Sequence, residues 1–246
     1  PSTIVLDTET TGAAPAADRL VSVAYKLGDT LTHELFKPPT EITIDAQATH
    51  HITPAMVADK PAFVDSVTKE ELKHLLSEHI LVAHNAAFDI GILQNEGVVA
   101  DRFICTLKVA RHLDGAGVIP RFGLQYLRYY LGLDVADATA HSADGDVLVT
   151  EALFNRLFEK MRADHDSEEA VLSSMIAISQ QPSLIRTLSF GKYRGQKMAQ
   201  VAETDPGYLQ WLLQAKENPK PDSEARSDDE DMIFSLKHYL KLHTAS

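Results

Sequence analysis

The stretch that decides the fold is Asp7-Thr8-Glu9-Thr10-Thr11-Gly12, which directly follows the short apolar run Ile4-Val5-Leu6. The apolar run predicts a buried strand, and residues two apart on a strand point to the same face. Asp7 and Glu9 should therefore project together from the strand end, with Thr8 turned away. Such close like charges repel unless a cation separates them or one carboxyl is protonated. Oxygen ligands suit a hard divalent ion such as Mg²⁺ or Mn²⁺, although an isolated triplet is more often a simple strand end.

The composition argues against several classes of protein. The 246-residue chain carries a formal net charge of −12 and a single cysteine, Cys105. One cysteine excludes an internal disulfide and a multi-cysteine zinc site, and it fits a reducing compartment. No stretch approaches the ~20 apolar residues of a membrane span and no secretory leader is evident, so we expect a cytoplasmic protein without a membrane partner. The acidic charge argues against a sequence-independent nucleic-acid coat, but it does not exclude an enzyme that holds a few nucleotides through bound metal.

Apolar periodicity predicts strands that first form a meander and then alternate with helices. The expected strands span residues 4–7, 20–27, 31–36, 80–83 and 103–105. The expected helices span residues 68–76, 88–95, 106–113, 124–131, 142–161 and 168–180. This order predicts an α/β domain with a mixed central sheet flanked by helices. We expect that domain over residues 1–165, a linker or bridging helix over 166–185, a small C-terminal module over 186–246, and a mobile acidic loop over 218–231.

A second polar cluster, His84-Asn85-Ala86-Ala87-Phe88-Asp89, follows the apolar run at residues 80–83. Asp89 falls in the first turn of the next predicted helix, where an acidic residue also complements the helix dipole. Asn85 likewise suits a helix cap. For each residue alone the structural explanation is the simpler one, but the cluster lies where a central strand delivers its carboxyl end.

A third cluster, His141-Ser142-Ala143-Asp144-Gly145-Asp146, opens the longest predicted helix. Positions 141 and 146 do not share a face if both are helical, because they are about 140° apart around the axis. If His141 lies on the preceding loop, however, it can turn toward a ligand that Asp146 also faces. Asp144, one helical turn from His141, is the rival acid.

Together the three clusters resemble the DEDD exonuclease superfamily, in the branch with a histidine in its third motif. The order is D-x-E on the first strand, an aspartate after an HN-x-x-F turn, and H-x4-D opening the last helix of the domain. Across roughly residues 3–161 the chain looks like the proofreading-exonuclease fold, an RNase-H-like α/β sheet. Three C-terminal segments, at residues 189–195, 205–212 and 236–240, resemble the C-terminal module of the exodeoxyribonuclease X family. Only the acidic loop after Asn218 lies outside the resemblance.

The resemblance implies a metal-dependent 3′→5′ exodeoxyribonuclease that releases 5′-mononucleotides from DNA 3′ ends, a DNA-binding hydrolase of the kind used in DNA repair. It implies hydrolysis with two divalent ions, Mg²⁺ or Mn²⁺, in one active site. By resemblance, Asp7 would bridge the two ions and Asp89 would serve the second. Glu9 and Asp146 would complete the site that holds the nucleophilic water. His141 would be the general base, for which the ordinary imidazole pKa of about 6.5 is suitable.

Implied substrate contacts extend around these carboxylates and into the C-terminal module. The seven positions are Thr10, Gly12, His50, Asn85, Phe88, Lys192 and Arg194. His50 matches the histidine of a His-Gly-Ile triplet in the family, but His51 replaces the glycine in this chain. Phe88 either packs under the turn or stacks a terminal base. Lys192 and Arg194 either contact phosphates, with an aromatic residue between them, or form a solvated turn.

Two alternative functions stay open. A 3′→5′ exoribonuclease would use the same catalytic site, because the residues do not distinguish a 2′-hydrogen from a 2′-hydroxyl. The non-catalytic alternative is a nucleic-acid-binding or polymerase-associated subunit with a vestigial site, and the presence of all five catalytic positions counts against it. The expected partner is a DNA 3′ end, single-stranded or at a duplex terminus, with RNA as its rival.

Overall fold

Five strands form one mixed sheet in the computed structural model, which describes residues 2–136, 138, 140–220 and 226–244. They are β1 (Thr3–Thr10), β2 (Leu20–Leu27), β3 (Thr30–Leu35), β4 (Ile80–Ala83) and β5 (Phe103–Cys105). The strands lie in the order β3-β2-β1-β4-β5, with β1 to β3 antiparallel and with β4 and β5 parallel to β1. The predicted mixed sheet is confirmed, and the strand that carries the first acidic pair lies at its centre.

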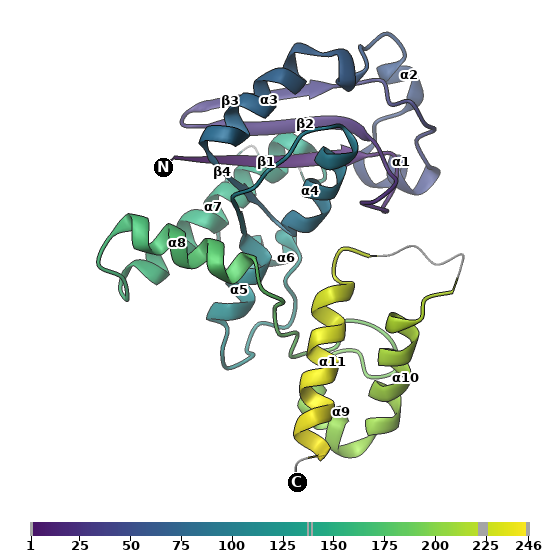
Figure 1. Cartoon of the computed structure of the whole chain (residues 1–246), viewed down its shortest axis with the longest axis vertical. Helices are drawn as coiled ribbons and strands as arrows, with labels where there is room; N and C mark the ends of the chain where they lie inside the picture. Colours follow the sequence, from purple (N-terminus) through teal and green to yellow (C-terminus); the bar gives the residue numbers. More distant parts are fainter. Residues whose placement is uncertain (1, 137, 139, 221–225, 245–246) are drawn as a thin grey trace.

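Helices cover both faces of the sheet (Figure 1). One face packs against α5 (Thr106–Leu113), α6 (Leu124–Tyr130), α7 (Ala143–Arg162) and α8 (Glu168–Ser179). The other face packs against η1 (Phe63–Asp65), α3 (Val67–Glu78) and α4 (Ala86–Asn95). Val5 belongs to the first core, whereas Ile4 and Leu6 belong to the second. Odd-numbered residues of β1 therefore point toward α7, and even-numbered residues point toward α4.

Three C-terminal helices form a group with a hydrophobic core of their own (Figure 1). They are α9 (Met198–Thr204), α10 (Pro206–Glu217) and α11 (Asp229–Thr244). Leu188, Leu209 and Leu236 are fully buried among them. No helix within the described ranges combines the length and the apolar character that crossing a membrane requires.

A buried polar contact fixes α11 to the rest of the chain. Asp231 accepts hydrogen bonds from the backbone nitrogen of Ser183 at 2.7 Å and from Nη1 of Arg111, on α5, at 3.1 Å. The hydroxyl of Ser183 donates to the same carboxylate at 2.9 Å. Only 6% of the Asp231 side chain and 11% of the Arg111 side chain are exposed. The Asp231 carboxylate is therefore satisfied almost entirely by the protein itself.

The structure differs from the sequence-based expectations in three places. Strand β1 continues through Thr10, because residues 8–10 still pair with β2. Helix α1 (Ile44–His50) was not predicted, since its seven residues are too few for a clear apolar period; its start is set by Thr43, whose side chain accepts from the Ala46 nitrogen. The expectation of an acidic loop over 218–231 was wrong at its C-terminal end, because residues 229–231 form the first turn of α11. Residues 221–225 of that loop lie outside the described residues.

Candidate active site

Three carboxylates meet at the carboxyl end of β1. One oxygen atom from each of Asp7, Glu9 and Asp146 lies within 4.8 Å of the others. Asp7 and Glu9 are odd-numbered residues of β1 and so face α7, whose first turn carries Asp146. The rival acid Asp144 is not in this group: its carboxylate lies 3.6 Å from the ring of His33, and 44% of its side chain is exposed.

The fourth predicted carboxylate, Asp89, comes from α4 on the opposite face of the sheet. It is 3% exposed, and its Oδ1 accepts hydrogen bonds from the Thr8 nitrogen at 3.1 Å and the Thr8 hydroxyl at 2.7 Å. Thr8 does turn away from Asp7 and Glu9, as predicted, but it thereby holds Asp89 in place. Sequence reasoning missed this role, because only the packing of α4 shows what lies on the even-numbered face of β1.

Burial shifts the pKa values of all four carboxyl groups upward, and for Asp7 and Glu9 the neighbouring acids raise them further. Burial, followed by the charges of the other three acids, raises the pKa of Asp7 well above its ordinary value. Burial and then Asp146 raise the pKa of Glu9 to about 8, and burial raises that of Asp89 to about 7 despite its bonds from Thr8. Burial also raises the pKa of Asp146. A cation among these oxygens would relieve the repulsion, so the donor set is compatible with a divalent metal ion.

His141 lies on the loop before α7, two residues ahead of the helix, with a left-handed φ of 58°. It borders a hollow of about 290 Å³, which we call the histidine hollow, together with Asp7 and Asp146. The exposed imidazole and the two carboxylates thus face one space. This is the loop placement that the spacing of His141 and Asp146 required for both side chains to serve one ligand.

Gln125, from the first turn of α6, also lines the histidine hollow, and sequence reasoning gave it no role. Its Nε2 donates to Oδ1 of Asp146 at 2.7 Å. Its Oε1 is buried and, among the described residues, accepts no hydrogen bond. Gln125 therefore fixes the orientation of the Asp146 carboxylate through its amide nitrogen. No pattern in the sequence marks a single glutamine at the start of a helix.

His84 holds the segment that carries Gln125. Its Nε2 donates to the carbonyl of Phe122 at 2.7 Å, and its Nδ1 lies 2.8 Å from the hydroxyl of Thr106. Burial lowers the pKa of His84 to about 4, so the ring is neutral at physiological pH. The His84 ring therefore links the end of β4 to the segment before α6.

A second hollow, of about 390 Å³, lies on the other side of Glu9, and we call it the threonine hollow. The predicted substrate positions Thr10, Gly12, His50 and Phe88 all line it. Phe88 is half-buried against the core and also borders the hollow, so packing and contact with a base are both open to it. The structure therefore brings four of the seven predicted substrate positions to one place beside the carboxylates.

His50 and Gly12 also have local structural roles. His50 is buried; its Nε2 donates to the carbonyl of Thr10 and its Nδ1 accepts from the nitrogen of Ile52, both at 3.0 Å. Burial lowers its pKa, so the ring is neutral and committed to the backbone. At Gly12, an added Cβ would lie 2.6 Å from a carboxylate oxygen of Asp18. Asp18 accepts hydrogen bonds from Thr11 and Ala14 and so stabilises this loop. Only glycine at position 12 allows the carboxylate of Asp18 to approach the backbone so closely.

Three predicted substrate positions lie outside the two hollows. Asn85 adopts a left-handed φ of 59° at the start of α4, and its Nδ2 donates to the hydroxyl of Ser227 at 2.8 Å. Lys192 is paired with Asp205 at 3.3 Å, and Arg194 is exposed on the same turn. Neither basic residue lines a hollow next to the carboxylates.

Comparisons with known proteins agree with this geometry. The chain matches the family described as Exonuclease over residues 4–154 and the family described as Exodeoxyribonuclease X-like C-terminal over residues 188–217. It is 33% identical over 240 residues to Exodeoxyribonuclease 10 of Escherichia coli, covering 96% of this chain and 98% of that protein. It is 30% identical over 201 residues to DNA polymerase III subunit epsilon of Haemophilus influenzae, covering 72% of this chain and 75% of that one.

A solved structure resembles the chain in three dimensions as well. It is Exonuclease X in complex with 5′ overhanging duplex DNA, at a TM-score of 0.57 and 29% sequence identity. The match covers 99% of the solved chain and 72% of this one.

Proposed function

Because the chain belongs to the exonuclease family, we propose that it is a metal-dependent 3′→5′ exodeoxyribonuclease that releases 5′-mononucleotides from DNA 3′ ends. The observation that carries the proposal is the meeting of Asp7, Glu9 and Asp146 within 4.8 Å, inside the segment that matches the family. The similarity to Exodeoxyribonuclease 10 over 96% of the chain supports DNA as the substrate. It also supports a division into a nuclease domain over residues 1–165, a linker over 166–185 and a C-terminal module over 186–246.

The carboxylates fit two divalent ions, Mg²⁺ or Mn²⁺. Asp7, Glu9 and Asp146 would hold one ion, and Asp89 together with Asp7 would hold the other. Such ions, when bound, stabilise the negative charge that develops on the attacking and leaving oxygens of a phosphodiester. The residues of the chain keep these ligands in place: Thr8 orients Asp89, and Gln125 orients Asp146.

His141 is suited to accept the proton of the attacking water. Its ring borders the same hollow as Asp7 and Asp146, and it lies on a loop that leaves it exposed. A neutral imidazole in that position can take up the proton as a general base. The leaving group is the 3′ oxygen of the shortened strand, and the product is a nucleotide with a 5′-phosphate.

The similarity to a polymerase subunit makes a polymerase-associated role the second candidate function. DNA polymerase III subunit epsilon is 30% identical to this chain, but the match covers 72% of the chain, against 96% for Exodeoxyribonuclease 10. The C-terminal helices also match the Exodeoxyribonuclease X-like family. These observations favour a free-standing exonuclease over a polymerase-associated subunit.

The test is product analysis on matched DNA and RNA oligomers labelled at the 3′ or the 5′ end, with Mn²⁺ or Mg²⁺ added. We expect mononucleotides from the 3′ end of DNA first, slower cleavage of RNA, and none of either in the presence of a chelator. The variant Asp7→Asn is the negative control, since a co-purified nuclease would survive it. Faster cleavage of RNA would move the assignment to an exoribonuclease, and no release from any 3′ end would contradict catalysis itself.

A further inference from the structure

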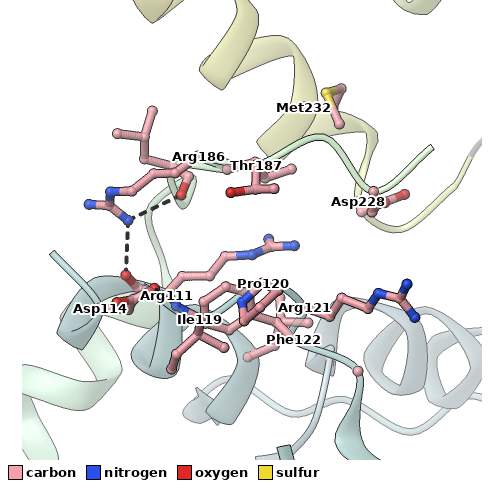
Figure 2. Close-up of a pocket in the computed structure, with 15 residues that line it drawn as sticks. Arg111, Asp114, Ile119, Pro120, Arg121, Phe122, Arg186, Thr187, Asp228 and Met232 are labelled. Carbon is pink, nitrogen blue, oxygen red and sulfur yellow. Dashed lines mark hydrogen bonds between the residues drawn. The ribbon is translucent and has the colours of Figure 1, made fainter. Parts of the chain in front are cut away.

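A cavity of about 260 Å³ lies between α5 and the C-terminal helices (Figure 2). We call it the arginine cavity, because Arg111, Arg121 and Arg186 all line it. One side is formed by α5 and the segment before α6, the other by residues 184–189 and the start of α11. Three guanidinium groups in one cavity are unexpected in a chain with a net charge of −12. The catalytic carboxylates do not line it.

Arg111 is nearly buried and only partly satisfied. Its Nη1 donates to Ser183 and Asp231, and its guanidinium carbon lies 5.7 Å from the centre of the Phe122 ring. Within the described part of the chain, its Nε and Nη2 donate to no other residue. Figure 2 shows this guanidinium extending into the cavity. Two donors of a planar fork are thus available to an anion that enters.

The other two arginines play different parts. Arg121 is exposed at the edge of the cavity, with its guanidinium carbon 5.7 Å from the centre of the Tyr126 ring. In Figure 2 its guanidinium extends in the same direction as that of Arg111. Arg186 turns the other way and donates to the carbonyl of Arg111 at 3.1 Å. Arg111 and Arg121 are therefore positioned to contact a ligand that enters the cavity. Arg186 instead joins the two sides of the cavity through its bond to the carbonyl of Arg111.

Two carboxylates also line the cavity. Asp114 accepts from the backbone nitrogens of Val118 and Ile119 at 2.8 and 2.9 Å, so both of its oxygens are engaged. Asp228 lies 3.9 Å from the guanidinium of Arg226. The charge of Asp228 also reaches Arg111, but within the described part of the chain no hydrogen bond joins the two, so the remaining donors of Arg111 stay open to an outside anion.

The arginine cavity connects with the surface around the catalytic carboxylates. A groove of about 440 Å³ shares Arg111 and Asp228 with the cavity and is lined at its other end by Asn85 and Phe88. Phe88 also borders the threonine hollow beside Glu9. A strand that enters the hollow with its 3′ end can therefore continue past Phe88 and Asn85 to the cavity.

We propose that the arginine cavity holds one nucleotide unit of the substrate strand, on the 5′ side of the nucleotide being removed. Arg111 and Arg121 contact its phosphate, because guanidinium forks match phosphate oxygens in pairs. The apolar part of the wall, which includes Ile119 and Met232, faces the sugar and base. A volume of about 260 Å³ lies near the lower limit of small-molecule pockets, so it has room for one nucleotide unit only. The inference rests on the proposed function and adds where the substrate strand runs.

The test compares Arg121→Glu with Arg156→Glu, which makes the same charge change on an exposed position of α7 away from the cavity. Each protein is assayed with Mn²⁺ on a thymidine dinucleotide and on a single strand of about 16 thymidines. In Arg121→Glu we expect the KM for the long strand to rise roughly tenfold with little change in kcat, so that the ratio of long-strand to dinucleotide kcat/KM falls by the same factor. The salt slope of long-strand binding should fall by about 0.7. Arg156→Glu should leave both quantities as in the wild type.

A second variant, Arg111→Lys, keeps the positive charge but removes the planar fork of donors. It should lower the ratio of long-strand to dinucleotide kcat/KM. Its melting temperature should fall less than that of a variant that loses the ion pair with Asp231. If the wild type cleaves both substrates and Arg121→Glu matches Arg156→Glu, the cavity does not hold the strand, although the proposed function stands. If the wild type cleaves neither substrate, the proposed function fails and this inference fails with it.

Discussion

Buried charge is arranged in opposite ways at the end of β1 and at the contact between α5 and α11. At the end of β1, the like charges of Asp7, Glu9 and Asp146 lie together, and burial raises the pKa of each. At the second contact, Asp231 is hydrogen-bonded to Arg111 and to a serine. Paired opposite charges complete a structure, whereas unpaired like charges persist where a ligand compensates them. The comparison separates a cluster of like charges, which a bound cation would compensate, from a carboxylate, Asp231, whose partners are residues of the chain itself.

The largest expected effect is the loss of catalysis in Asp7→Asn. The substitution keeps the shape of the side chain but removes a carboxylate of the proposed metal site, so turnover of a DNA 3′ end should fall on the order of a thousandfold. Thermal unfolding without metal should be unchanged or slightly improved, because one repelling charge is gone. The control is Asp144→Asn, close to Asp146 in the chain but outside the carboxylate group. A collapse in melting temperature would instead make Asp7 a structural residue.

At the contact between Arg111 and Asp231, removal of a carboxylate should lower the stability of the fold. Asp231→Ala leaves Arg111 buried without its partner, which costs roughly 3–5 kcal/mol in the free energy of unfolding. Urea denaturation measures this loss, and Glu230→Ala, a neighbouring exposed acid on α11, is the matched control. Equal small losses in the two variants would show that the buried pair does not hold the C-terminal helices in place.

A smaller effect is expected for Gln125→Ala. Gln125 fixes one oxygen of Asp146, so its removal should lower kcat/KM by roughly 10–100-fold. Raising the Mn²⁺ concentration should recover part of the activity, since the defect lies in ligand orientation. Gln94→Ala, on the exposed side of α4, controls for loss of an amide. A loss that added metal does not relieve would argue that Gln125 only supports packing.

The pH dependence of stability gives the smallest effect. In the metal-free folded state the pKa of Glu9 is about 8 and that of Asp89 about 7, both above their ordinary values near 4. The folded state then binds more protons than the unfolded state, so this stability is fully present below about pH 4 and is lost as pH rises to about 8. In a chelator, the wild type should lose about 1 kcal/mol more than Asp7→Asn over this range, roughly 2–4 °C in melting temperature. Parallel profiles would mean that the carboxylates do not repel as described.

The placement of the acidic pair was predictable because the two-residue period of a strand is local. Asp7 and Glu9 had to share a face wherever the strand lay. The choice of Asp146 over Asp144 was predictable only from the resemblance, and it depends on where α7 begins.

Other contacts depend on residues far apart in the chain. Thr8 meets Asp89 across 81 positions, and Arg111 meets Asp231 across 120. No local period encodes such pairs, because the packing of α4 on one face and of α11 against α5 decides them. The arginine cavity follows from the same long-range packing and could not be predicted from the sequence.

Calorimetric titration of Mn²⁺ into the metal-free protein at pH 7, in two buffers with different heats of protonation, addresses the carboxylate group itself. At that pH Glu9, with a pKa of about 8, is mostly protonated in the free protein. A metal site built on these carboxylates should bind Mn²⁺ with release of protons, and that release should shrink at pH 9. In Asp7→Asn the binding should be lost or much weakened. Binding of equal strength in the variant, or no binding to the wild type, would contradict a metal-dependent nuclease site at the end of β1.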